Sequence, residues 1–503
     1  MRLKLLTAAT LVLAVLAACG PETTQTLPPP KPLIPTEAPP IAPEPAKPEP
    51  KVIRLTSASP QALAAFEQAS QLADQARYGQ AFDLYRQATA LDADFAAARA
   101  FYGANLAGAA GDEELTLALD LAHNRSETEE LLVEMLFYQR RSDLEKAGSA
   151  ATRLSLAARE DKRAYTYAGQ FAYETGDFDN AAKHLNNALA LDPRHGPALN
   201  LLAYLNNRMG KTEQAVAFAK QYAEAYPDEP NAHDTYGEIL MNAAKLPESE
   251  ASFLKATELA PTFTSAWLAL AQLRAQRGDA KGAAVALAQA KLHATVPTEV
   301  LLVQTTPAWV ALAQGNASGA AAAFDAADKV IAAQLPSLTP LVTLQRAWMA
   351  YLRAKPADAV RLAQAAVDQS AAPQVGDPLA AAVKRWAGTV TVLGLARQGQ
   401  AAEAERVLGV AEADAAKAPF EPMLTSRLTH AKGMVLAAGG KVDAGIATLE
   451  TCAKTDFACL WDRVQLLQQK SGKVASQAAR QRLMDRTDRD PTYPFVRKLA
   501  SGR

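Results

Sequence analysis

Among the reactive residues of this chain, the three cysteines have the most informative sequence surroundings. Cys19 closes an apolar stretch behind Leu16, Ala17 and Ala18, whereas Cys452 and Cys459 lie seven residues apart near the other end. A thiol can be alkylated, oxidised to a disulfide or used as a nucleophile, and its surroundings decide which. The two locations therefore predict different chemistry.

The segment around Cys19 has the pattern of an export signal. Arg2 and Lys4 are followed by residues 5–18, which carry no charge and are apolar apart from two threonines. This run is shorter than the roughly 20 residues of a membrane span and matches the apolar region of a secretory signal. The sequence Leu16-Ala17-Ala18-Cys19 resembles the lipobox of bacterial lipoproteins. The resemblance implies removal of residues 1–18 and lipidation of Cys19.

The lipoprotein resemblance also predicts where the protein lies. In that family the cysteine carries a diacylglycerol and an acylated amino group, and two or more chains anchor a protein stably to a membrane. Gly20 occupies the position at which an aspartate favours the inner membrane in enteric bacteria. We therefore expect a lipid-anchored protein of the bacterial cell envelope, at the outer membrane and facing the periplasm.

Cys452 and Cys459 form the remaining pair, and export would expose them to an oxidising compartment. On one continuous helix they would lie about 10 Å apart along the axis, which is too far for a disulfide. A turn near Thr455 and Asp456 would bring them within reach. The sequence favours a Cys452–Cys459 disulfide, with two buried free thiols as the alternative.

Other combinations of reactive residues give little support for catalysis. Gly210-Lys211-Thr212 resembles the end of a phosphate-binding loop, but Leu205 stands where that loop requires its first glycine. The six histidines form no close metal-binding pair, and no serine lies in a nucleophile elbow. Asp485, Asp488 and Asp490 lack the glycine and glutamate of a calcium loop. We predict a protein that is not an enzyme and has no metal, cofactor or small-molecule substrate.

Residues 19–59 are predicted to form a tether between the lipid and the body. Twelve of the 30 prolines lie between Pro21 and Pro50, and the segment has no apolar periodicity. Such a segment favours an extended polyproline conformation of about 3.1 Å per residue. The prediction is a disordered spacer with a reach on the order of 100 Å.

The rest of the chain is organised by a repeat of 34 residues, clearest over residues 162–295. Small residues recur in mid-helix at Gly169, Ala203, Gly237 and Ala271, and turn residues follow seven positions after each. This register resembles the tetratricopeptide repeat. The resemblance implies an all-α, right-handed superhelical solenoid of antiparallel helix pairs over residues 60–456, with roughly eleven units. Capping helices and a basic tail follow over residues 457–503.

In tetratricopeptide proteins the first helix of each pair lines a concave, partner-binding surface. Asparagine and glutamine can pair with an extended peptide backbone, and tyrosine adds apolar area with a polar tip. The resemblance places thirteen such side chains in the groove: Arg163, Gln170, Tyr173, Asn200, Tyr204, Asn207, Arg208, Asn231, Asp234, Glu238, Asn242, Gln272 and Gln276.

These features predict a periplasmic scaffold that assembles a cell-envelope complex through protein or peptide partners. Lipoproteins of similar build serve pilus or secretin assembly, polysaccharide export or cell-wall synthesis, and all three stay open. With 52 basic and 53 acidic residues, the chain lacks the basic excess of a nucleic-acid binder. The alternative is a direct activator or subunit of an envelope enzyme with a site in residues 298–503. A β-containing domain there would favour that alternative.

Overall fold

The computed structural model describes residues 51–75, 77–106, 108–416, 422–453 and 456–484, together with residues 496 and 500. The predictions for the signal peptide, for Cys19 and for the proline-rich part of the tether lie outside these residues. The same holds for Asp485, Asp488 and Asp490. The chain divides into two compact units, and the described residues of unit 2 are 51–70 and 79–171 except 107.

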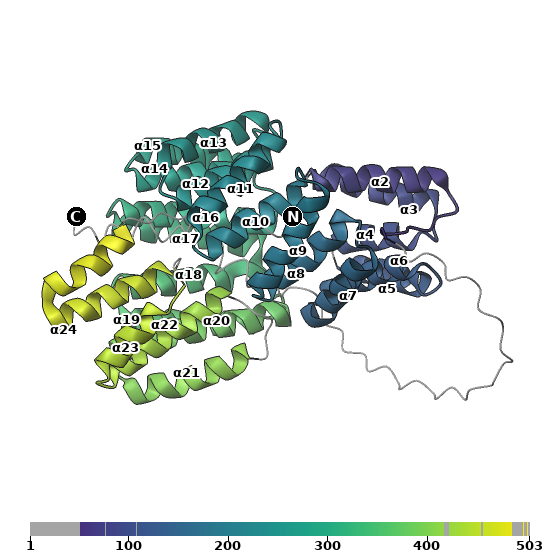
Figure 1. The fold of residues 1–503 in the computed structure, drawn as a ribbon. Helices are drawn as coiled ribbons and strands as arrows, with labels where there is room; N and C mark the ends of the chain where they lie inside the picture. Colours follow the sequence, from purple (N-terminus) through teal and green to yellow (C-terminus); the bar gives the residue numbers. More distant parts are fainter. Residues whose placement is uncertain are drawn as a thin grey trace, which may run out of the picture. The chain divides into compact units, whose positions relative to one another are not determined.

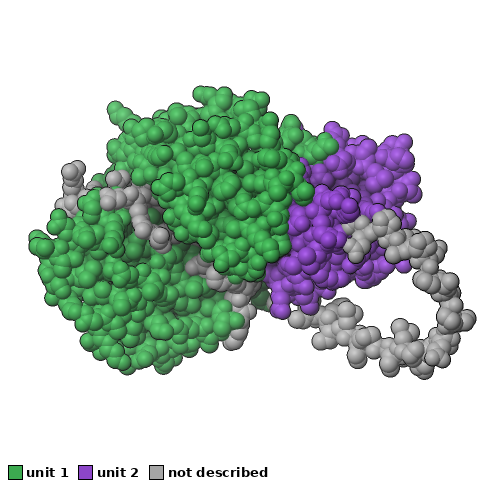
Figure 2. All heavy atoms as spheres, in the orientation of Figure 1, with its two compact units in different colours: residues 1–19, 71–78, 172–503 green, residues 20–70, 79–171 purple. Residues whose placement is uncertain are grey.

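The helices follow one another as antiparallel pairs, which confirms the predicted all-α fold (Figure 1). Unit 2, drawn in purple in Figure 2, contains three complete or nearly complete pairs and most of the following helix. These helices are α2 (Pro60–Asp74), α3 (Tyr78–Leu91), α4 (Ala96–Asn105), α5 (Ala109–Ala122), α6 (Glu127–Arg140), α7 (Leu144–Ala157) and α8 (Lys162–Glu174).

The described residues of unit 1 are 71–78 except 76 and those from 172 onward, and this unit too consists of helix pairs. After α8 come the helices α9 (Phe178–Leu191), α10 (Gly196–Arg208), α11 (Thr212–Ala225), α12 (Pro230–Asn242), α13 (Leu246–Leu259), α14 (Thr264–Gln276), α15 (Ala280–His293), α16 (Pro297–Ala313) and α17 (Ala317–Gln334). After a short 3-10 turn come α18 (Thr339–Leu352), α19 (Pro356–Ser370), α20 (Asp377–Arg397), α21 (Ala401–Ala415), α22 (Pro422–Ala438), α23 (Val442–Glu450) and α24 (Phe457–Met484).

The turn within each pair requires a left-handed backbone at one position. Gly176, Gly210 and Gly278 adopt positive φ angles of 83°, 73° and 80° there. Glycine adopts this conformation without the steric cost that a Cβ atom imposes. Ala244 occupies the same place in its repeat with φ of 61°. Gly210 and Lys211 of the rejected phosphate-loop match therefore lie in an ordinary turn between two helices.

The small residues of the repeat allow paired helices to approach closely. At Gly237 of α12, a Cβ atom would lie only 2.7 Å from Cδ1 of Phe253 on α13. Phe253 is fully buried in a cluster with Met241, Leu270 and Leu273. Each pair therefore buries its apolar face against its neighbours in the stack, as expected for repeats that are not stable alone.

Residues from 298 onward form helix pairs as well. A single large apolar core joins α16 to α24, and it includes Trp309, Trp348 and Trp386. No strand occurs among the residues described in this region. The described residues of this region thus contain no compact β-containing domain of the kind that would have favoured the enzyme-linked alternative. No described helix has the length and apolar character needed to span a membrane.

Candidate functional site

The thirteen predicted groove residues lie on the first helices of four successive pairs: α8, α10, α12 and α14. None of them is fully exposed. Six are half-buried, namely Arg163, Gln170, Asn207, Arg208, Asn242 and Gln276. The other seven, Tyr173, Asn200, Tyr204, Asn231, Asp234, Glu238 and Gln272, are buried. The set therefore contributes to packing between repeats in addition to any contact with a partner.

Within unit 1, hydrogen bonds connect these helices at intervals close to one repeat. The Tyr204 hydroxyl donates to Oε2 of Glu238 at 3.0 Å, and the Thr235 hydroxyl donates to Oδ1 of Asn200 at 2.9 Å. The Ser265 hydroxyl donates to Oδ2 of Asp234 at 3.2 Å. These contacts form a polar ladder from α10 through α12 to α14, since equivalent positions of neighbouring repeats face one another.

Three amide side chains beside this ladder keep polar atoms without a hydrogen-bond partner among the described residues. These atoms are Oδ1 of Asn231, both polar atoms of the Asn242 amide and Oε1 of Gln272. All four atoms are buried. A buried polar atom without a partner costs about 1–3 kcal/mol, and native proteins contain few of them. The buried amides of α12 and α14 therefore have donor and acceptor capacity that the described residues do not use.

Other predicted groove residues have roles inside the fold. The Arg208 guanidinium lies 5.1 Å from the centre of the Tyr173 ring and 5.8 Å from that of Phe178. Burial raises the pKa of Tyr173 and outweighs the opposing effect of Arg208. In unit 2, Arg163 pairs with Glu67 at 3.3 Å. Arg163 and Arg208 are thus held by neighbouring side chains in the structure.

A second polar cluster, centred on Asp462 of α24, was not predicted from the sequence. The carboxylate of Asp462 is fully buried and bonds to the Tyr351 hydroxyl, the Arg397 guanidinium and Nε2 of His430. Burial alone would raise its pKa, but Arg397 and the hydrogen bonds lower it to about 2. The four residues come from α18, α20, α22 and α24 and join these helices through one carboxylate.

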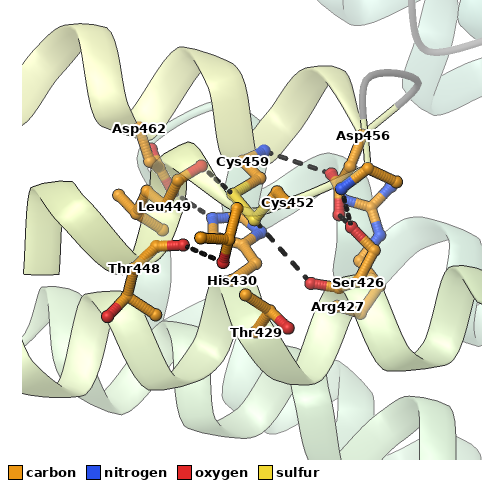
Figure 3. Close-up of a disulfide and its surroundings, with 12 residues drawn as sticks. Ser426, Arg427, Thr429, His430, Thr448, Leu449, Cys452, Asp456, Cys459 and Asp462 are labelled. Atoms are coloured by element: carbon orange, nitrogen blue, oxygen red, sulfur yellow. Dashed lines mark hydrogen bonds and ion pairs between the residues drawn. A yellow bond between two sulfur atoms is a disulfide. The ribbon is translucent and has the colours of Figure 1, made fainter. Parts of the chain in front are cut away.

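A disulfide lies next to this cluster and joins Cys452 to Cys459, with the two Cα atoms 6.6 Å apart (Figure 3). Asp456 begins α24: its Oδ1 accepts the Cys459 N–H at 3.1 Å, and its Oδ2 accepts the Ser426 hydroxyl at 3.0 Å. Arg427 also pairs with Asp456. The disulfide and these contacts hold the start of α24 against α22 and α23.

The Asp462 cluster has the composition of a catalytic site but the environment of a structural one. Tyr351, His430 and Asp462 are each fully buried. No group of three His, Cys, Asp or Glu side chains in the described chain could hold a metal ion. A carboxylate surrounded by three donors and inaccessible to solvent can fix the packing of helices. Part of the predicted basic tail is also paired, since Arg463 contacts Glu450 at 2.8 Å.

The described helices stack in pairs as an all-α repeat fold, as predicted. The sequence model of the tetratricopeptide repeat matches residues 172–239. A solved tetratricopeptide repeat protein from Parabacteroides merdae is 18% identical, with a TM-score of 0.40, and the match covers 51% of this chain and 98% of that one. The type IV pilus biogenesis factor PilW is 17% identical with a TM-score of 0.35, covering 42% and 95%. No curated protein matches the chain.

Proposed function

We propose that this chain is a lipid-anchored scaffold of a bacterial cell envelope that assembles a protein complex by binding a partner polypeptide on the face formed by α10, α12 and α14. The observation that carries the binding proposal is the group of buried amide atoms of Asn231, Asn242 and Gln272 without partners. An extended polypeptide supplies N–H and C=O groups that satisfy such atoms. Each pairing removes a cost of about 1–3 kcal/mol.

The regular spacing of polar side chains along the ladder supports a ligand that crosses several repeats. Gln272 follows Glu238 by one repeat of 34 residues, and Glu238 follows Tyr204 by the same interval. Equivalent positions of stacked repeats form a line, so a polypeptide placed along the ladder would meet one polar side chain per repeat. The ladder also holds the helices in place before binding, and this lowers the entropic cost of binding a partner.

The test is chemical crosslinking and pull-down from detergent-solubilised envelope, comparing the wild-type chain with the variant Asn242→Leu/Gln272→Leu. Leucine has a similar volume and removes the amide atoms. We expect the variant to lose its partners and to keep or increase its thermal stability, since the unpaired amides are gone. Unchanged partner recovery from the variant would overturn the proposed site.

The proposed anchor has its own test. Metabolic labelling with palmitate should label the wild-type chain, while Cys19→Ser should remain unlabelled and leave the membrane fraction. A labelled Cys19→Ser variant would overturn the anchor and leave the binding proposal unaffected.

A further inference from the structure

The last part of the predicted tether is bound to unit 2 as an extended strap, defined as residues 51–58. Its side chains alternate in exposure as expected for extended backbone: Ile53 and Leu55 are half-buried, whereas Val52 and Arg54 are exposed. The prolines stop at Pro50, so every residue of the strap can donate a backbone N–H group. The structure shows where those groups bond.

The strap crosses three successive connections between helix pairs. The Lys51 carbonyl accepts the Glu160 N–H at 2.7 Å, before α8. The Arg54 N–H donates to the Thr128 hydroxyl at 2.9 Å, and its carbonyl accepts the Ser126 hydroxyl at 2.6 Å, at the start of α6. Near the strap's end, the Ala58 N–H donates to Asp92 at 2.9 Å, before α4.

The spacing of these contacts matches the repeat. Arg54 follows Lys51 by three residues and Ala58 follows Arg54 by four, which is roughly 10–13 Å of extended chain between one connection and the next. Packed helices lie about 8–10 Å apart. An extended chain thus meets a new pair of bonding groups at each connection, without a bend in the strap.

A buried carboxylate, that of Glu129, directly follows Thr128, the residue that bonds the middle of the strap. Glu129 of α6 is fully buried, and its Oε1 accepts the Ala97 N–H at 3.3 Å. Burial raises the pKa of Glu129, while hydrogen bonds from Thr56 and Ala97 oppose that rise. The Ser57 hydroxyl donates a hydrogen bond to Oδ2 of Asp92, so the site contacts this strap side chain directly. Most of the other hydrogen bonds to the strap use its backbone N–H and C=O groups. The site therefore depends more on an extended backbone than on the identity of the strap side chains.

We propose that this edge of unit 2 is a second peptide-binding site, separate from the α10–α14 face, which recognises the backbone of an extended, proline-free polypeptide segment together with one hydroxyl side chain equivalent to that of Ser57. In the structure the chain's own residues 51–58 occupy it in cis. A segment of another polypeptide reaches the site when the strap leaves, so the strap both fixes the end of the tether and controls access.

The experiment uses the full chain and a fluorescent peptide of residues 51–59 added in trans. The variant Ile53→Pro/Arg54→Pro/Ala58→Pro removes three N–H donors from the strap: Ile53 to Asp161 at 3.3 Å, Arg54 to Thr128 and Ala58 to Asp92. The matched control is Val52→Pro/Leu55→Pro, because the N–H groups of these residues make no hydrogen bond within the described chain. Hydrogen exchange of the Lys51–Ser59 amides reports whether the strap has left.

The triple proline variant should lose the hydrogen-exchange protection of its remaining strap amides. It should also bind the peptide at least tenfold more tightly than the wild-type and control chains. Adding Thr128→Val to that variant should weaken peptide binding severalfold. The proposal is wrong if the released strap leaves a chain that binds no peptide. It is also wrong if the strap stays protected without its donors, since backbone recognition would then be unnecessary.

Discussion

Tyr204 and Glu238 occupy equivalent positions of neighbouring repeats, and the tyrosine hydroxyl donates a 3.0 Å hydrogen bond to the buried carboxylate. Removal of the donor in Tyr204→Phe should destabilise unit 1 by about 1–3 kcal/mol, because a bond to a charged group is lost in a buried place. Urea unfolding followed by tryptophan fluorescence measures the change. The control Tyr236→Phe, at a half-buried tyrosine of the repeat that contains Glu238, should change the unfolding midpoint little.

Ala244 is the turn residue of its repeat and adopts φ of 61°, where three other repeats have glycine. Ala244→Gly should therefore stabilise the protein by about 1 kcal/mol, since the left-handed backbone no longer carries a Cβ atom. The neighbouring change Ala243→Gly, at φ of −84°, should destabilise it instead. Equal effects of the two changes on the melting temperature would contradict this explanation.

Asp462 should make the free energy of unfolding of unit 1 depend on pH below about pH 4. Its pKa is about 2 in the fold against 3.8 as the ordinary value, so the unfolded chain binds the proton first as the pH falls. The stabilisation is complete above about pH 4 and is lost towards pH 2, with a total of about 2 kcal/mol. Urea midpoints between pH 7 and pH 3 should fall more for wild type than for Asp462→Asn. The control Asp358→Asn, at a residue whose side chain is only half exposed on α19, should retain the wild-type slope.

The Cys452–Cys459 disulfide closes a short loop, for which chain entropy predicts a stabilisation of about 2–3 kcal/mol. Cys452→Ser/Cys459→Ser should lower the urea midpoint, and dithiothreitol should have the same effect on wild type but none on the variant. A thiol assay of the denatured chain without reductant checks the bond itself. Two reactive thiols at these positions would exclude the disulfide.

The sequence predicted the repeats well because their register depends on local packing that every unit shares. Gly237 had to be small because Phe253 of the paired helix fills the space, and the interval of 34 residues repeats that constraint. The Asp462 cluster could not be predicted in this way. Its members Tyr351, Arg397 and His430 come from separate irregular repeats, so no fixed spacing links them.

The strap was missed for a different reason. Residues 51–59 were assigned with the proline-rich segment to a disordered tether, yet residues 52–57, Val-Ile-Arg-Leu-Thr-Ser, contain no proline and are rich in residues that favour extended backbone. This change in composition after Pro50 was the available signal. The contacts themselves depend on residues such as Asp92, Ser126 and Glu160. These residues are distant in the sequence, and only the folded chain places all of them along the strap.

The central proposal is that a partner polypeptide lies on the α10–α14 face beside the unpaired amides. Photo-crosslinking in living cells tests it most directly, with a photoreactive amino acid placed at Asn242 or, as a control, at Val285, which is 59% exposed on α15. The account predicts a specific protein adduct from position 242 that is absent from position 285. No adduct from position 242, or the same adduct from both positions, would contradict it.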